Sequence, residues 1–277
     1  TGAQTYNDGV TVGADLTLST TNGNITFGST YDGGSHDLTI TGSVGTGTMT
    51  FTGAVTNLGN ATGTSLTVQA GQTGLVRFMN PVSGVSGLSF ADGTSVRFDG
   101  DVTLTGGDTA NSFLGNVVLD GLTFSSSQAL QFGNSAAADQ VTLSGGAVTI
   151  DTSAGNQAVT FTSKIDGEQV LTVSGGIAVT TFNGVVGGTI PLTSLTTDAG
   201  GSTSINGGAV TTTGAQTYND PVTLGAGTAI TTSTGPIQFV QDLSGANTLT
   251  INGGTGNVIF SSTIGGGADP TNLSITT

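Results

Sequence analysis

The chain of 277 residues contains no cysteine and no tryptophan, and it has only one histidine and five prolines. Without cysteine there is neither a disulfide framework nor a thiolate metal site. Helix-forming residues are scarce too, because Lys164 and Glu168 are the single lysine and the single glutamate. Glycine, threonine, serine and valine dominate instead, and these residues favour strands and turns over helix interiors. We therefore expect almost no helix.

Basic residues are equally rare. Three lysine and arginine residues stand against seventeen acidic ones, which gives a net charge of −14. Such a chain repels nucleic acid and anionic lipid, so we expect no nucleic-acid partner. No apolar run is long enough to cross a bilayer, so we expect no membrane insertion either. Most of the acids are aspartates, which are typical of turns.

A long repeat organises the chain. The residues TGAQTYND at positions 1–8 return unchanged at positions 213–220, an offset of 213 − 1 = 212. Repeats of this kind must be recognised before any other pattern, because they decide the architecture. We interpret residues 1–212 as one long repeat and residues 213–277 as the start of a second copy. One continuous body spanning 1–277 is the simplest domain organisation.

A shorter repeat of about 21 residues lies within the long one, and an aromatic residue followed four positions later by an aliphatic one marks it. Side chains at equivalent positions of stacked coils lie above one another, so we expect these aromatics to form an internal ladder. The predicted ladder comprises Tyr6, Phe27, Phe51, Phe78, Phe98, Phe161, Phe182, Tyr218, Phe239 and Phe260.

The first full coil shows how one repeat is built. Short strands are expected at 25–27, 38–40 and 49–51, where apolar and polar residues alternate. Turns are expected at 32–35 and 45–47, which are rich in glycine. Three such strands per coil, each paired with the coils above and below, define an all-β, single-stranded parallel β-helix, or β-solenoid.

Several phrases of the chain resemble a known family. The segments LTVSGG (171–176), VTFTS (159–163), TTFNGVVGG (180–188) and GAQTYNDPVTL (214–224) are similar to the repetitive passenger regions of large bacterial exoproteins. These are the filamentous-haemagglutinin-like and autotransporter-type adhesins. The resemblance implies a right-handed β-helical stalk, secreted or at the bacterial cell surface, that serves adhesion or matrix building. We interpret the chain as a piece from the interior of such a protein.

Candidate chemistry is concentrated in one small cluster. Arg77 and Arg97 lie 97 − 77 = 20 residues apart, so we expect them on the same outer face in adjacent coils, close to Asp99 and Asp101. The ordinary interpretation is a turn with a surface ion pair worth less than about 1 kcal/mol. A catalytic or sugar-binding site is the alternative.

Metal binding finds little support. His36 is the lone histidine and lies in a glycine-rich turn, so it is a poor metal ligand or catalytic base. Asp32, Asp120 and Asp166 each precede a glycine, which is typical of a turn. We expect no cofactor and at most weak calcium binding.

Outward threonines suggest a further alternative. Pairs of the form Thr-x-Thr, as on ice-binding β-solenoids, occur at 39/41, 103/105, 160/162 and 248/250, with a triplet at 48/50/52. They do not recur in every coil, and β propensity alone favours threonine there. Ice binding is therefore an outside alternative.

These observations favour a structural protein over an enzyme. We expect a segment of a large repetitive extracellular protein that forms a stiff fibre or stalk. Its expected partners are neighbouring copies of the same repeat, stacked end to end or joined in one longer chain. A module that binds a glycan or a host surface is the main alternative, and a polysaccharide-active enzyme is a more distant one.

Overall fold

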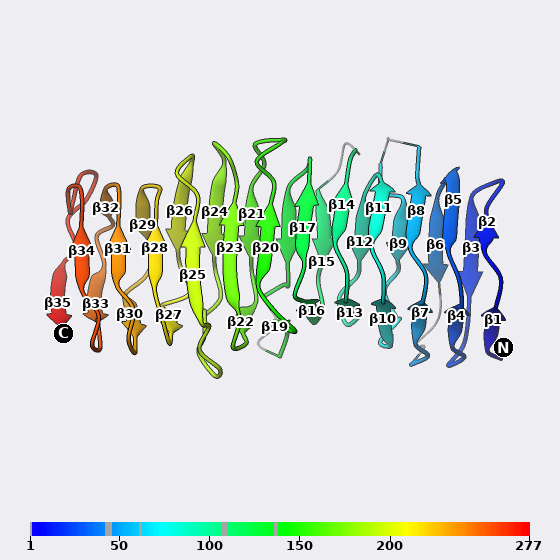
Figure 1. Cartoon of the computed structure of the whole chain (residues 1–277), viewed down its shortest axis with the longest axis horizontal. Coiled ribbons are helices and arrows are strands. Elements are labelled where there is room, and N and C mark those ends of the chain that lie inside the picture. Colours follow the sequence, from blue (N-terminus) through cyan, green and yellow to red (C-terminus); the bar gives the residue numbers. More distant parts are fainter. Residues whose placement is uncertain (1, 42–45, 61–62, 107–109, 136–137) are drawn as a thin grey trace. The chain divides into compact units, whose positions relative to one another are not determined.

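A computed structural model describes residues 2–41, 46–60, 63–106, 110–135 and 138–277. These residues form β-strands joined by turns and contain no helix. The chain divides into two compact units, residues 1–139 (unit 1) and residues 140–277 (unit 2). Each unit is a stack of short parallel strands, shown in Figure 1 with the strands labelled in chain order.

Unit 1 contains three parallel sheets, and the chain visits them in turn. The first sheet comprises β1 (Gln4–Tyr6), β4 (Ile25–Phe27), β7 (Met49–Phe51), β10 (Leu75–Phe78), β13 (Ser95–Phe98) and β16 (Val117–Asp120). The second comprises β2 (Val10–Thr11), β5 (Tyr31–His36), β8 (Val55–Leu58), β11 (Val82–Val85), β14 (Val102–Leu104) and β17 (Thr123–Ser126). The third comprises β3 (Leu16–Ser19), β6 (Leu38–Thr41), β9 (Leu66–Val68), β12 (Leu88–Phe90), β15 (Asn111–Phe113) and β18 (Leu130–Phe132).

Unit 2 repeats this plan. Its first sheet comprises β19 (Gln140–Ser144), β22 (Lys164–Asp166), a single bridge at Val186, then β27 (Ala209–Thr212), β30 (Thr228–Thr232), β33 (Thr248–Asn252) and β35 (Asn272–Thr276). The second comprises β20 (Val148–Asp151), β23 (Val170–Ser174), β25 (Ser194–Thr197), β28 (Gln216–Tyr218), β31 (Ile237–Phe239) and β34 (Val258–Phe260). The third comprises β21 (Val159–Phe161), β24 (Val179–Phe182), β26 (Ser202–Ile205), β29 (Val222–Leu224) and β32 (Leu243–Ser244).

One strand from each sheet makes up a rung, and successive rungs are about 22 residues apart. Pairing is parallel and in register, as between Tyr6 and Phe27 or between Val148 and Leu171. Within a strand the residues alternate, so that Ile25 and Phe27 are buried whereas Thr26 between them faces outward. The predicted parallel β-solenoid is therefore confirmed in each unit.

The aromatic residues of the predicted ladder do stack on one another, but they form several separate stacks and not one ladder. In unit 1, five of the residues stack through the first sheet, with neighbouring ring centroids 4.9 to 5.1 Å apart: Tyr6, Phe27, Phe51, Phe78 and Phe98. In unit 2, Phe161 and Phe182 stack in the third sheet, whereas Tyr218, Phe239 and Phe260 stack in the second. The prediction of a single column was wrong, because all three strands of a rung can place an aromatic residue inward.

Phe113 extends a further stack that the sequence pattern had missed. It is fully buried in the third sheet of unit 1, where it stacks on Phe90 and Phe132 at 5.5 and 5.3 Å. Its strand begins with Asn111 rather than with an apolar residue. Asn111 is nonetheless 1% exposed and accepts a hydrogen bond from the Leu88 N–H at 2.7 Å. A satisfied amide thus occupies an apolar position of the core.

The turn expected at 32–35 is part of a strand. β5 runs through these residues, and its register with β8 shifts between Asp32 and His36, as in a β-bulge. Gly34 and Ser35 adopt positive φ angles of 57° and 66°, which the bulge accommodates. The other expected turn, at 45–47, begins at residue 45, which lies outside the described residues.

Candidate functional site

The two arginines lie where their spacing predicts. Arg77 in β10 and Arg97 in β13 are paired in register in the first sheet of unit 1. The flanking Val76, Phe78, Val96 and Phe98 point inward and are buried, so the guanidinium groups point outward. Two cations are thus held one rung apart, about 4.8 Å along the stack.

Asp99 joins the two arginines. Its Oδ2 accepts a hydrogen bond from Arg77 Nε at 2.6 Å, and its Oδ1 accepts one from Arg97 Nε. Arg97 also donates from Nη2 to Asp120 Oδ2 in the next rung of the sheet. The result is an alternating row, Arg77–Asp99–Arg97–Asp120, in which two positive charges meet two negative ones.

Asp101 does not belong to this row. Its Oδ1 instead accepts the backbone N–H of Thr123 at 2.9 Å, so it links successive rungs elsewhere. Asp120, which the sequence had suggested only as a turn residue, takes its place in the row. The signal that could have found it is its spacing of 120 − 99 = 21 residues from Asp99, close to one rung.

The row is suited to holding rungs together. Side-chain exposure falls from 38% at Arg77 to 12% at Asp99, so the Asp99 carboxylate is largely enclosed. Every charge has an opposite partner, which leaves no surplus charge to activate a nucleophile or to attract an ionic ligand. Surface pairs of this kind contribute up to about 1 kcal/mol each, more when they form a network.

His36 lies near an aspartate but not near a set of ligands. Its Nδ1 is 3.6 Å from Asp15 Oδ1, and the ring is partly exposed. Burial raises the pKa of the neighbouring Asp37, and the Asp15 carboxylate adds to this rise. The predicted turn aspartates bind protein groups, since Asp32 accepts the Gly34 N–H and Asp166 accepts the Thr189 and Ile190 N–H groups.

Clusters that could hold a metal were sought across the described part of the chain. No three histidine, cysteine, aspartate or glutamate side chains in that part come close enough to share a metal ion. Asp101 and Asp198 instead each accept a backbone N–H group from a residue 22 positions away in the chain, those of Thr123 and Gly176.

The most unusual carboxylate is one that sequence reasoning missed. Asp220, between β28 and β29 of unit 2, is 1% exposed and accepts hydrogen bonds from the hydroxyls of Thr197 and Thr203, all at 2.9 Å. Burial raises the pKa of Asp220 to about 6, although the two threonine hydroxyls act in the opposite direction. Asp198 adds a smaller rise. Asp220 therefore gains or loses its proton at mildly acidic pH.

Within the described strands, the threonine pairs at 39/41 and 248/250 do not extend into the flat double array of an ice-binding surface. Thr39 and Thr41 pair with Thr17 and Ser19 on one side, but on the other only Thr39 has a threonine partner, Thr67. In unit 2 the pair at 248/250 lies between strands that place Ala229 and Ser274 beside Thr250. At 39/41 one threonine column continues where the second stops, whereas at 248/250 Thr250 has no threonine partner and Thr248 pairs with Asn272.

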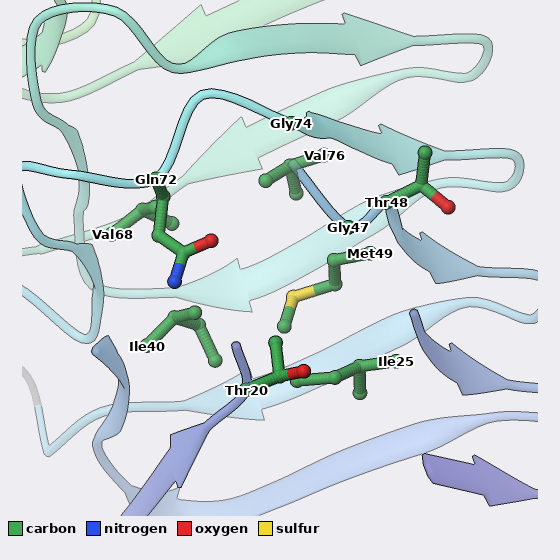
Figure 2. A pocket seen from close by; sticks show the side chains of 10 residues that line it. All are labelled: Thr20, Ile25, Ile40, Gly47, Thr48, Met49, Val68, Gln72, Gly74 and Val76. Carbon is green, nitrogen blue, oxygen red and sulfur yellow. The ribbon is translucent and has the colours of Figure 1, made fainter. Parts of the chain in front are cut away.

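A small hollow opens within unit 1 between the first and third sheets. It is lined mainly by apolar side chains, among them Ile25, Ile40, Met49 and Val76. Figure 2 shows the Gln72 side chain extending into it. Gln72 is 5% exposed, and its Nε2 has no hydrogen-bond partner among the described residues. Thr20 and Thr48 also line the hollow, so its polar side chains are one amide and two hydroxyls.

No family model, curated protein or solved structure matches the chain. Among the described residues, none belongs to a helix that would be long and apolar enough to cross a membrane. The sites described above therefore rest on their own geometry.

Proposed function

We propose that the chain is a structural segment of a large repetitive extracellular protein, in which it forms part of a stiff fibre or stalk. The observation that carries this proposal is the rung-to-rung continuity within each unit. Residues about 22 positions apart are connected in three ways. Their strands pair, their buried aromatic rings stack, and side chains beside the strands, such as Asp101, accept hydrogen bonds from the next rung.

Stiffness follows from how these contacts are distributed. In unit 2, Tyr218 stacks on Phe239 and Phe239 on Phe260 at 5.0 and 5.3 Å, with ring planes 7° from parallel. Bending the stack would have to separate these rings and stretch the parallel ladders beside them. Repeat stacks of this kind gain stability from each neighbour interface, so a longer array is a more stable one.

The charged sites give less support for a catalytic function than the rung-to-rung contacts give for a structural one. The row of Arg77, Asp99, Arg97 and Asp120 is internally neutralised, and Asp220 is enclosed by threonine hydroxyls. We propose that these groups hold rungs in place and that the protein is not an enzyme. The cell-surface location is part of the same proposal, and the resemblance of the repeat phrases to bacterial exoproteins supports it.

Proteins that carry tandem copies of the repeat test the proposal directly. Proteins carrying one, two and four copies of residues 1–212 are imaged as single particles by atomic force microscopy. A structural fibre predicts contour lengths that rise in proportion to copy number, at constant width. Strings of separate particles joined by flexible hinges would contradict the proposal. Disrupting one inward stack, as in Phe51→Ala, which removes the ring between Phe27 and Phe78, provides a control that introduces a defect at a known place.

A further inference from the structure

The hollow between the first and third sheets of unit 1 has the size of one water molecule. The space that the centre of a water-sized sphere can reach inside it is about 10 Å³. One water needs roughly 10 to 15 Å³ on this measure, and clefts that hold organic ligands are far larger. The hollow therefore has room for a water molecule but not for a sugar.

Gln72 places an amide in this hollow. Its main-chain oxygen accepts a hydrogen bond from Thr94 Oγ1 at 2.8 Å, and Thr94 is itself buried. This hydrogen bond fixes the backbone from which the Gln72 side chain extends. Figure 2 shows the amide extending from there in the direction of Ile40, within the group of residues that line the hollow.

A second buried glutamine shows how an amide is satisfied elsewhere in the chain. Gln216 in unit 2 is 0% exposed, and its Nε2 donates to Thr212 Oγ1 at 3.1 Å and to the main-chain oxygen of Thr231 at 2.8 Å. Gln72 is nearly as deeply buried, but its Nε2 is directed into the hollow and meets no acceptor among the described residues. A buried donor needs a partner, so the contents of the hollow must supply one.

Thr20 offers an acceptor from another side of the hollow. Its Oγ1 donates to the main-chain oxygen of Gly23 and accepts the Gly23 N–H, both at 2.9 Å. A hydroxyl oxygen has two lone pairs, so one acceptor position of Thr20 Oγ1 is left over. Thr20 is 4% exposed, whereas Thr48, the other hydroxyl that lines the hollow, is exposed and open to bulk water.

Thr20 and Gln72 are too far apart for a direct hydrogen bond. Thr20 follows β3 and Gln72 follows β9, and β6 lies between these two strands in the third sheet. Two rung steps of about 4.8 Å separate the two backbones by about 10 Å along the stack, whereas a hydrogen bond spans about 3 Å. The glutamine side chain covers part of this separation, and one bridging molecule covers the rest.

We propose that the hollow is a binding site for one ordered water molecule, which accepts a hydrogen bond from Gln72 Nε2 and donates one to Thr20 Oγ1. The water joins two rungs of the third sheet that are not neighbours. Such a bridge is nearly as favourable as a direct hydrogen bond. The walls formed by Ile25, Ile40 and Val76 are apolar, so these two side chains orient the water.

Diffraction from crystals of the unaltered chain, at a resolution that reveals ordered waters, tests the site directly. A single peak should lie in the hollow, about 2.7 to 3.2 Å from both Gln72 Nε2 and Thr20 Oγ1. An empty hollow would overturn the inference. So would a Gln72 amide that bonds to a protein group, or a water that contacts only one of the two side chains.

A double-mutant cycle tests the bridge in solution. Gln72→Leu, Thr20→Val and the double variant are compared with the unaltered chain by denaturant unfolding. Either single substitution removes the bridge, so the second should add less than it does alone, and the unfolding equilibrium constants should deviate from multiplicativity by at least roughly threefold. Multiplicative effects would overturn the inference. Stabilisation by Gln72→Leu would also overturn it, because a dry hollow would gain from losing an unsatisfied amide.

The long repeat supplies a matched control. Thr232 is the counterpart of Thr20 at an offset of 232 − 20 = 212, is equally buried, and donates from Oγ1 to the Gly214 main-chain oxygen. It does not line the hollow, so Gln72→Leu and Thr232→Val should act independently. If a substituted chain fails to fold, the diffraction result on the unaltered chain decides. The water site is independent of fibre formation, so its failure is distinguishable from failure of the structural proposal.

Discussion

The same eight residues occupy positions 1–8 and 213–220. The structure gives residues 2–8 and 214–220 two different environments. In both places the Tyr hydroxyl donates to the Gln Oε1 two residues earlier, Tyr6 to Gln4 at 3.2 Å and Tyr218 to Gln216 at 3.0 Å. Each tyrosine also stacks on the aromatic residue 21 positions later. Local geometry is therefore reproduced.

Burial is what differs. Tyr6 is 36% exposed, and its strand β1 pairs with β4 alone, whereas Tyr218 is fully buried in β28 between β25 and β31. Asp8 is exposed, whereas Asp220 is buried under Thr197 and Thr203 of the rung before it. The octapeptide thus forms the same strand and the same Tyr–Gln hydrogen bond in both places, and in unit 2 the strands β25 and β26 bury its tyrosine and its aspartate.

Truncating the tyrosines should show the largest contrast. Tyr218→Ala removes a buried ring from the middle of a stack and should lower the free energy of unfolding by about 3 to 5 kcal/mol. Tyr6→Ala removes a partly exposed ring and should cost clearly less. Denaturant unfolding followed by circular dichroism measures both, and equal losses would show that the two positions are alike.

The second largest effect is expected from removing the Asp220 carboxylate, which should change how the free energy of unfolding depends on pH. Burial raises the pKa of Asp220 from the ordinary value of 3.8 to about 6, so the folded state holds this proton more tightly than the unfolded state. The resulting stability is fully present below pH 4 and is lost as pH rises through 6, a change of about 3 kcal/mol. Unfolding is measured between pH 4 and 7.

Asp220→Asn should abolish that part of the slope. Other carboxyls, including Asp37 and Asp139, have raised pKa values and contribute to the total, so the difference between variants is the informative quantity. An unchanged slope in Asp220→Asn would disprove the assignment.

Deleting only the hydroxyl tests the shared hydrogen bond. Tyr218→Phe leaves the buried Gln216 Oε1 without its donor and should cost about 1 to 3 kcal/mol. At Tyr6 the same change should cost little, because water replaces the lost donor at an exposed site. Thermal unfolding of the two phenylalanine variants measures both losses of stability. A larger loss in Tyr6→Phe than in Tyr218→Phe would contradict this account.

Tyr31 extends the comparison to a buried tyrosine that lacks the glutamine. Its hydroxyl is buried with no hydrogen-bond partner among the described residues, and burial raises its pKa to about 12. Tyr31→Phe should therefore be neutral or stabilising by up to about 1 kcal/mol, opposite in sign to Tyr218→Phe. A clear loss of stability would indicate a partner for the hydroxyl.

The fold was predictable from the sequence because its signal is local and repeated. Alternation of the type Ile25-Thr26-Phe27 appears in strand after strand, and glycine and aspartate separate the strands. The sheet on which each aromatic lies was not predictable, because all three strands of a rung carry the same alternation. Phe182 and Tyr218 look equivalent in sequence and lie in different sheets of unit 2.

The candidate site was predictable in part, for a related reason. Arg77 and Arg97 lie at the centres of regular strands, where spacing sets position, and they came together as expected. Asp99 and Asp101 follow a strand, where a difference of two residues along a turn sends them to different partners. The burial of Asp220 depends on threonines 17 and 23 residues earlier, which no local pattern indicates.

The central claim is that successive rungs stack in register, and the absence of cysteine makes it directly measurable. Spin labels on paired cysteines introduced at Thr149 and Gln238 span four rungs of the second sheet in unit 2, through Thr172, Thr196 and Thr217. Labels at Thr17 and Gln131 span five rungs of the third sheet in unit 1.

Double electron–electron resonance should give narrow distance distributions centred near about 19 Å for the first pair and about 24 Å for the second, since each rung adds about 4.8 Å. Broad distributions, or distances that do not grow with the number of intervening rungs, would contradict the stacked-rung account.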